Sequence, residues 1–337
     1  MADTSASFTT GNGTAYGDIG SRTATFAERE LLKRALPYLV LEKFGQSKPI
    51  PTKSTKTIKF RKYNPLALAT TPITEGVTPS SKQLTASDVT ANLDQFGDLV
   101  TISDVILDTH EDPVLQEATE ILGEQAAQTI ETIRFNVLKA GTGVRYANGA
   151  ARSAVNTALT LSTQRKCIRD LKRQNARAIT KIVRSTPSYG TEAVAPSFIG
   201  LVHPDMEGDI RNIAGFTPTE KYGSMTPYES EIGKIEDVRY VSSTVFSAWT
   251  DAGGAKGTMI STTGTSADVY PVLFVSRDAF GIVPLKGRAS ITPSVVNPHP
   301  SESDPLAQRG HIGWKSMTTC VILNDAWMVR AECGVTD

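Results

Sequence analysis

The chain has 337 residues, of which 39% are hydrophobic and 21% are charged, a composition typical of a globular protein with a sizeable buried core. Lysine plus arginine and aspartate plus glutamate both number 35, so the formal net charge is zero. A dedicated nucleic-acid-binding protein normally carries a basic excess. Any contact with nucleic acid is therefore expected on one local face.

The three cysteines are Cys167, Cys320 and Cys333, an odd number without CxxC spacing. This pattern argues against a disulfide framework or a structural zinc site and favours a reducing compartment. The N-terminus lacks the basic and apolar regions of a secretory signal, and no run approaches the ~18 apolar residues of a membrane helix. We therefore expect a protein that is made and used in a cytoplasm.

Residues 1–24 are rich in Ser, Thr, Gly and Ala, and such a segment buries too little apolar surface to order by itself. A mobile arm is expected there. Thr25 and Glu28 have the spacing of a capping box, and leucines at helical spacing follow. A helix is predicted over residues 25–45, kinked or ended by Pro37 and stopped by Gly45.

Residues 46–102 predict a projecting hairpin. In the first strand, over residues 53–62, Ile58 and Phe60 share one face. A Pro- and Thr-rich tip follows, and a second strand is predicted over residues 87–102. The apolar face of that strand switches near Gly97, for which a β-bulge is the simplest explanation. With little apolar content between them, these strands are expected to project from the body.

A long helix is predicted over residues 113–140, with Asp112 as N-cap, Pro113 at the first helical position and Gly141 at the end. At ~1.5 Å per residue it is a rod of about 40 Å. Its apolar stripe is expected to consist of Val114, Ala118, Ile121, Ala126, Ile130, Ile133 and Val137. Its opposite, polar face is expected to carry Glu120, Glu124, Gln128, Glu131 and Arg134.

From about residue 150 the pattern is mixed α/β. The expected elements are a helix capped by Ser162 and running through Arg177, strands at 197–202 and 238–249, a buried hairpin of 269–276 with 279–285, a long crossing segment at 291–311, and a C-terminal hairpin of 314–323 with 326–332. In that last hairpin Cys320 lies opposite Val329, so a disulfide with Cys333 is not expected.

No phosphate-binding loop, nucleophile elbow or zinc-protease motif is present. His203, Asp205, Glu207 and Asp209 have the residue types of a metal site. A helix N-cap with acidic first-turn residues accounts for them better. No catalytic, cofactor or metal residues are therefore assigned.

Two clusters of cations have an open interpretation. The 163–177 helix is basic because it carries Arg165, Arg169, Lys172 and Arg173. These side chains either face the phosphates of DNA or form a solvated face that pairs with acidic neighbours, and we favour the solvated face. Lys53, Lys56, Lys59, Arg61 and Lys62 on the first hairpin strand either protect an exposed edge or form ion pairs with an adjacent subunit.

The order of these elements resembles the HK-97-like fold of tailed-bacteriophage major capsid proteins across essentially the whole chain. Three local runs are similar to the N-4-like phage family of these proteins: GLVHPD from Gly200 followed by Asp209-Ile-Arg211, YPVLFVSRDAF from Tyr270, and DPLAQR from Asp304 through Gly313-Trp-Lys315. The resemblance implies an α+β fold with an N-arm (1–24), an N-terminal helix (25–45), an E-loop (46–102), a peripheral domain (103–150) with a spine helix (113–140), an axial α/β domain (151–290) and returning peripheral strands (291–337).

The resemblance implies a major capsid protein that is not an enzyme, needs no cofactor and assembles into the pentamers and hexamers of an icosahedral shell around double-stranded DNA. Its expected partners are further copies of itself, the packaged DNA, and separate scaffolding, portal and decoration proteins, with assembly in the host bacterial cytoplasm before residence in the virion. The alternative is another phage structural subunit, such as a tail-tube or decoration protein.

Overall fold

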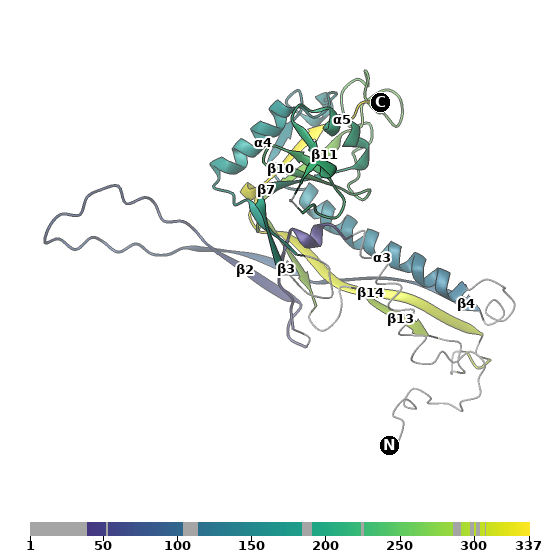
Figure 1. Ribbon diagram of the computed structural model, residues 1–337. Coiled ribbons are helices and arrows are strands. Elements are labelled where there is room, and N and C mark those ends of the chain that lie inside the picture. The colour runs from purple at the N-terminus through teal and green to yellow at the C-terminus, as the bar shows by residue number, and fades with distance from the viewer. Residues whose placement is uncertain are drawn as a thin grey trace.

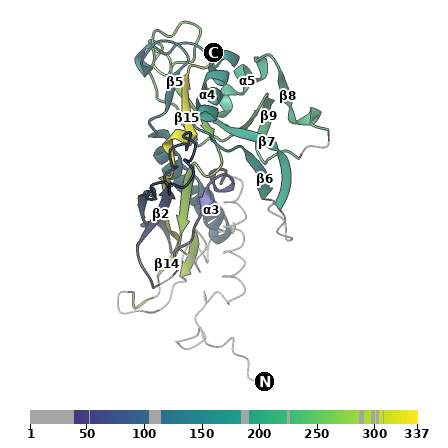
Figure 2. The ribbon, with the colours of Figure 1, turned by 90° about the vertical axis from the view of Figure 1, so that its left-hand side faces the viewer.

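The computed structural model describes residues 39–51, 53–103, 114–183, 191–223, 226–285, 291–296, 300, 304–306 and 308–337 (Figure 1). The arm predicted at 1–24, most of the helix predicted at 25–45, and the cap at Asp112 and Pro113 lie outside these residues. An eight-stranded sheet, the upper sheet, lies above a five-stranded sheet, the lower sheet (Figures 1 and 2). A two-stranded hairpin projects to one side (Figure 1). This arrangement fits the predicted α+β class.

The eight-stranded sheet has the order β5-β15-β11-β7-β10-β9-β8, with β6 paired to β7. Strand β11, Tyr270–Val275, lies between β15 and β7 and is buried at every position, as expected for a continuous apolar run covered on both faces. The other strands are β5 (Val144–Tyr146), β6 (Ile179–Val183), β7 (Thr191–Val202), β8 (Phe216–Pro218), β9 (Glu231–Ile235), β10 (Val238–Ser242) and β15 (Met328–Cys333). The strand predicted at 238–249 therefore ends at Ser242.

Two helices lie beside this sheet, α4 (Leu161–Arg173) and α5 (Glu207–Asn212). On α4, Cys167, Ile168 and Leu171 join the buried cluster formed by the apolar side chains of the sheet. The predictions for both ends of α4 were wrong. The N-cap is Thr160, whose side chain accepts a hydrogen bond from the Thr163 N–H, and the helix ends at Arg173.

The five-stranded sheet has the order β1-β12-β14-β13, and β4 pairs with β14. These strands are β1 (Gln46–Ser47), β4 (Asp94–Ser103), β12 (Phe280–Pro284), β13 (Thr292–Val296) and β14 (Arg309–Ile322). The long helix α3, Val114–Lys139, runs along β14 and β4 (Figure 1). None of the helices in the described ranges is long and apolar enough to cross a membrane.

The extent of α3 agrees with the predicted helix, but the predicted polar face was partly wrong. Ile121, placed in the apolar stripe, is 62% exposed, whereas Glu131 and Arg134, placed on the polar face, are fully buried. Ala126 and Ile130 of the predicted stripe are buried as expected, and Leu122, Ala127, Phe135 and Leu138 are buried with them. Paired charges can occupy a buried face, and periodicity of apolar residues does not detect them.

The predicted second hairpin strand is two strands. β2, Thr57–Tyr63, pairs with β3, Ala86–Asn92, in register from Thr57 with Asn92 to Tyr63 with Ala86. After Leu93 the chain leaves this ribbon, and β4 pairs with β14 without interruption through Gly97. The bulge prediction was therefore wrong: the apolar face switches because the chain moves from one sheet to another.

The two other predicted hairpins were also wrong. β11 pairs with β15 and β7, whereas β12 pairs with β14 and β1, so these consecutive strands belong to different sheets. Likewise β14 and β15 do not pair with each other, although a short turn, Asp325–Trp327, connects them. Neither range 151–290 nor range 291–337 coincides with one sheet. The predicted placement of Cys320 opposite Val329 was wrong as well, because Cys320 pairs with Ile282 and Val329 pairs with Phe274. The three cysteines are free.

One buried cluster joins the two sheets. It contains Leu201 and Leu273 of the eight-stranded sheet, Phe280 of the five-stranded sheet, and Phe135 of α3. The N-terminal end of the described chain contributes to the same cluster through Leu41, in the 3₁₀ turn Leu41–Lys43. The two sheets therefore share a core and are not separate globular units.

Candidate assembly surfaces

The five cations predicted at the hairpin are all exposed, and two of them are paired inside the subunit. Arg61 donates from Nε and Nη2 to the two carboxylate oxygens of Asp88, at 2.9 and 3.0 Å, directly across the β2–β3 ribbon. These hydrogen bonds lower the pKa of Asp88. Lys56 Nζ lies 3.5 Å from an oxygen of Asp94. In the described part of the chain, no carboxylate comes within ion-pair distance of the remaining three, Lys53, Lys59 and Lys62.

The base and the tip of the hairpin differ in burial. At the base, Phe60, Ala91 and Leu93 pack with Ile50 and Val283 in a small core. Every residue from 64 to 85 is exposed. The hairpin is therefore anchored at its base and has no core of its own beyond it.

The tip of the hairpin, residues 64–85, carries apolar side chains that the sequence analysis missed. Six of the eleven large hydrophobic side chains exposed in the described residues lie on it or at its edge, namely Tyr63, Leu66, Leu68, Ile73, Val77 and Leu84. Leu68 is 86% exposed and Ile73 74% exposed. Concentrations of exposed apolar side chains mark interaction surfaces. The sequence feature that could have indicated this surface is the presence of Leu66 and Leu68, two positions apart, in a stretch of otherwise small residues.

A groove of about 610 Å³ lies on the five-stranded sheet, over β4, β13 and β14. Gly97 and Gly313 lie in its lining, and the exposed side chains of Leu99 and Val296 belong to it together with His311 and Lys315. A Cβ atom at Gly313 would lie 2.7 Å from the Asp98 carbonyl oxygen, so the close approach of β14 to β4 at this point depends on glycine. The groove combines apolar walls with the cation Lys315, the ionisable His311 and the carboxylate of Asp98.

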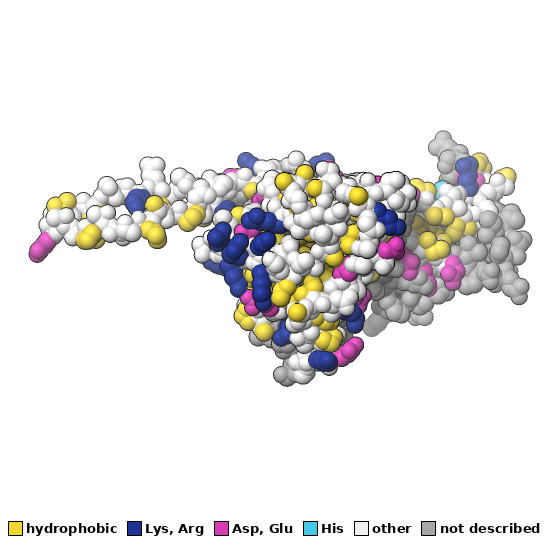
Figure 3. Space-filling model, turned by 90° about the horizontal axis from the view of Figure 1, so that it is seen from above, with side chains coloured by type: hydrophobic (Ala, Val, Ile, Leu, Met, Phe, Trp, Pro, Cys, Tyr) yellow, Lys and Arg dark blue, Asp and Glu magenta, His cyan; other side chains and the backbone are white. Residues whose placement is uncertain are grey.

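The four predicted cations of α4 line one shallow pocket, and Figure 3 shows lysine and arginine side chains gathered in a dark-blue patch on this side of the molecule. Arg165 Nε donates to Glu236 Oε1 at 3.0 Å, which lowers the pKa of Glu236, and Lys172 forms an ion pair with Asp237. These pairs agree with the interpretation that the cations of α4 bind acidic neighbours.

Two other cations predicted on α4, Arg169 and Arg173, differ from Arg165 and Lys172. Both line a shallow pocket of about 440 Å³ beside the Glu236–Asp237 turn. Within the described residues no carboxylate forms an ion pair with either of them. Half of the predicted cluster thus remains available for an external anion.

His203 caps the turn that precedes α5, as the sequence analysis favoured. Its Nδ1 accepts from the Asp205 N–H at 3.3 Å, and Asp205 in turn accepts from the Tyr270 hydroxyl at 2.7 Å. Asp209 accepts from the Thr336 N–H at 2.9 Å. No cluster of three metal-ligating side chains occurs among the residues that the structure describes.

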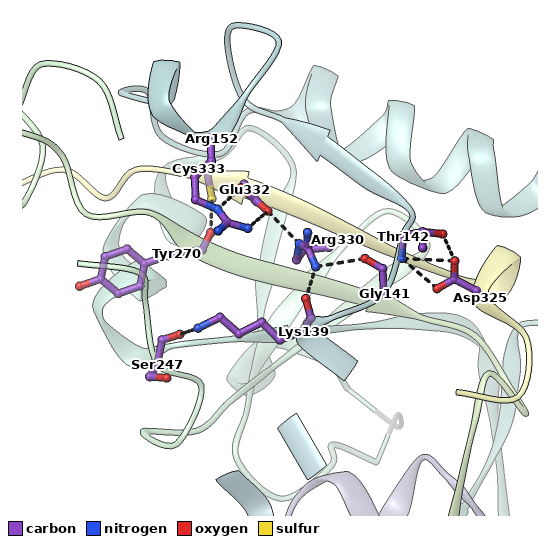
Figure 4. Close-up of polar contacts among 10 residues, drawn as sticks. All are labelled: Lys139, Gly141, Thr142, Arg152, Ser247, Tyr270, Asp325, Arg330, Glu332 and Cys333. Atoms are coloured by element: carbon purple, nitrogen blue, oxygen red, sulfur yellow. Dashed lines mark hydrogen bonds and ion pairs between the residues drawn. The ribbon is translucent and has the colours of Figure 1, made fainter. Parts of the chain in front are cut away.

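A charge cluster centred on the buried residues Glu332 and Arg330 joins α3 to the eight-stranded sheet (Figure 4). Glu332 of β15 accepts from Arg152 at 2.8 and 2.9 Å and from Arg330 at 2.9 Å. Arg330 also donates to the carbonyl oxygens of Lys139 and Gly141, at the end of α3. The Arg152 guanidinium and the Lys139 ammonium lie 3.6 and 4.0 Å from the Trp249 ring centroid.

This cluster fixes the orientation of the long helix against the upper sheet, because one guanidinium caps the C-terminal carbonyls of α3 while its carboxylate partner lies in β15. Burial, followed by the nearby charges of Arg152 and Arg330, lowers the pKa of Lys139 to about 8. Residues up to 191 positions apart meet here, so no local sequence pattern indicates the cluster.

Comparison with known proteins identifies the kind of molecule that carries these surfaces. No curated protein sequence matches the chain. A family model described as phage capsid protein matches residues 86–311, more than half of the chain. The chain belongs to the phage capsid protein family.

Solved phage capsids have the same fold as this capsid protein. The capsid of Ralstonia phage GP4 matches with a TM-score of 0.64 at 11% identity, covering 87% of each chain. The capsid of cyanophage Pam1 matches with a TM-score of 0.60 at 14% identity, covering 100% of each chain. An encapsulin of Synechococcus elongatus matches with a TM-score of 0.53 at 10% identity, covering 97% of this chain and 94% of the other.

These matches confirm the HK-97-like, α+β capsid fold that the order of elements predicted. With the family match, they confirm a self-assembling major capsid protein of a phage head shell, a structural protein and not an enzyme. Its place is the virion capsid. The narrower resemblance to N-4-like phages, the domain boundaries and the contact residues stay predictions.

Proposed function

We propose that this capsid protein forms the pentamers and hexamers of an icosahedral shell around double-stranded DNA, and that the hairpin tip is its main contact with a neighbouring subunit. The exposed apolar tip is the observation that carries the proposal. Leu66, Leu68, Ile73 and Val77 gain nothing from folding of the single subunit, and burial against a neighbour would stabilise each of them. The hairpin is the E-loop of the predicted domain scheme.

The groove over β4, β13 and β14 is the proposed receptor for the tip of a second copy. Leu99 and Val296 provide apolar walls, and Lys315 provides a cation. Glu75 is the only acidic residue of the tip. The tip also carries one cation, Lys82, and the groove one carboxylate, Asp98, which already accepts from Gln125 at 2.7 Å. Lys315 is therefore the charge of the apolar groove that Glu75 of the apolar tip complements.

Replacing Leu66, Leu68, Ile73 and Val77 by serine tests the tip. Folded subunits that no longer close into shells are expected, measured by analytical ultracentrifugation and negative-stain microscopy, with circular dichroism reporting the fold. Leu306→Ser, at a comparably exposed leucine in the turn before β14, is the control and should assemble. Normal shells from the tip variant would overturn the proposal, and tubes from the unaltered protein would favour a tail-tube subunit.

Charge reversal tests the groove. Glu75→Lys and Lys315→Glu should each lower the yield of shells, and the double variant should recover it, because the two charges exchange places across the interface. Lys82→Glu, also on the tip, is the control for a change of charge alone. Equal defects in the double variant and both single variants would exclude contact between Glu75 and Lys315.

For the packaged DNA, the proposed contacts are Arg169 and Arg173 of α4, with Arg165 and Lys172 held by Glu236 and Asp237. Each phosphate contact adds about 0.9 to the slope of log affinity against log salt. The Arg169→Gln, Arg173→Gln double variant should therefore lose up to about 2 of that slope in filter binding with duplex DNA. The same slope as in the unaltered protein would place the DNA contact elsewhere.

We also propose that assembly takes place in the host bacterial cytoplasm and involves separate scaffolding, portal and decoration proteins. Expression of the capsid protein in bacteria without any other phage protein tests the need for scaffolding. Closed shells of one size would show that no other protein is required to set their geometry.

A further inference from the structure

The N-terminal end of the described chain is a short strap, residues 39–44, packed between α3 and the sheets. Leu39 lies in the cluster below α3, and Val40, Leu41 and Phe44 lie in the cluster shared by both sheets. Leu41 has no exposed surface. The strap therefore anchors the N-terminal end of the described chain to the folded subunit.

A single buried carboxylate on α3 binds the backbone of this strap. Glu131 Oε1 accepts from the Val40 N–H at 3.0 Å and from the Leu41 N–H at 2.7 Å. These N–H groups open the 3₁₀ turn Leu41–Lys43, whose own N-cap residue makes no side-chain cap. Glu131 thus acts as the cap of a turn that lies 90 residues earlier in the chain.

The charged and titratable groups around Glu131 come from three elements. Arg134 of α3, itself fully buried, has its Nη1 3.8 Å from Glu131 Oε2 and its Nη2 3.1 Å from Oε1 of Glu42, on the strap. Cys320 of β14 also lies within electrostatic reach of Glu131 and Arg134. Two carboxylates therefore share one guanidinium, and Glu131 is the one without exposure to water.

We propose that Glu131 is a proton-operated latch for residues 39–44. The neutral Glu131 side chain holds these residues against α3, and the charged side chain releases them and becomes exposed to water. The neutral carboxyl group keeps its acceptor oxygen for both N–H groups without a buried charge. The charged form has one guanidinium, shared with Glu42, to offset its loss of water, and such sharing only partly offsets the cost of burying a charge.

The direction of the switch follows from proton linkage. Burial raises the pKa of Glu131 to about 7, against the opposing effects of Arg134 and the two N–H groups, from an ordinary value of 4.5. The closed strap therefore binds the proton more tightly than the open one. Opening is favoured as pH rises from about 4.5 to about 7, and roughly tenfold more opening is expected at pH 8 than at pH 6.

Hydrogen–deuterium exchange of the full-length, unassembled chain tests the latch. After correction for intrinsic exchange, opening of the peptide that contains residues 39–44 should increase about tenfold between pH 6 and pH 8. Glu131→Gln keeps a neutral acceptor in place and should abolish this dependence. Glu117→Gln, at an exposed position of the same helix, should retain it.

A second variant keeps the test decisive if Glu131→Gln folds poorly. Glu42→Gln leaves Arg134 to Glu131 alone and removes the like charge that raises the pKa of Glu131, so the transition should move to lower pH. Opening that does not change with pH in the unaltered protein, or an unmoved transition in Glu42→Gln, would overturn the latch. Since the measurement uses single subunits, its result is independent of shell formation.

Discussion

The three cysteine thiols lie inside the main cores. Cys167 and Cys333 belong to the cluster around the upper sheet, and Cys320 belongs to the cluster that joins the sheets. Burial raises the pKa of Cys167 and of Cys320 to about 12, and that of Cys333 further still. Since the thiolate is the reactive form, both its low population and its enclosure suppress reaction.

We expect none of the three thiols to react with an aromatic disulfide reagent at pH 8 in the native protein, and all three to react in about 6 M guanidinium chloride. Absorbance of the released thiolate measures both numbers. Leu68→Cys places a thiol on the exposed tip and should add one fast equivalent, which controls for reagent activity. A fast native equivalent without that substitution would mean that one of these cores opens readily.

At the scale of elements, α4 has two candidate N-cap residues, Thr160 and Ser162, which lie two positions apart. Thr160 Oγ1 accepts from the Thr163 N–H at 3.2 Å, whereas Ser162, which the sequence pattern suggested, is an exposed residue inside the first turn. Thr160→Ala should lower the free energy of unfolding by about 1 kcal/mol. Ser162→Ala should change it by only a few tenths, measured by urea denaturation. Equal losses in both variants would contradict the assignment of the cap.

The elements themselves were largely predictable, and their pairing was not. Local periodicity located α3 because one apolar stripe repeats over 26 residues. It could not show that β11 and β12 separate into two sheets, since strand pairing depends on residues far apart in sequence. The cations of the hairpin and of α4 were identified from the sequence, and their role as contacts stays a prediction. The apolar tip and the burial of Glu131 were not, because they depend on what surrounds each side chain.

At the scale of the whole molecule, the chain passes repeatedly between the two sheets. The link from β11 to β12 and the link from β14 to β15 each cross from one sheet to the other. The cluster around Phe280 contains side chains from both sheets, α3 and the strap. The lower and upper sheets are therefore joined by covalent crossings as well as by packing.

Because the core is shared, both sheets should unfold as one cooperative unit. Phe280 is fully buried, and Phe280→Ala should cost about 3–5 kcal/mol through the cavity it leaves. Hydrogen exchange should then speed up by the same factor in the slowest amides of β7, in the upper sheet, and of β14, in the lower sheet. Ile121→Ala, at an exposed position of α3, should change neither. Acceleration confined to β14 would show that the upper sheet unfolds independently, and that the crossings join two units of separate stability.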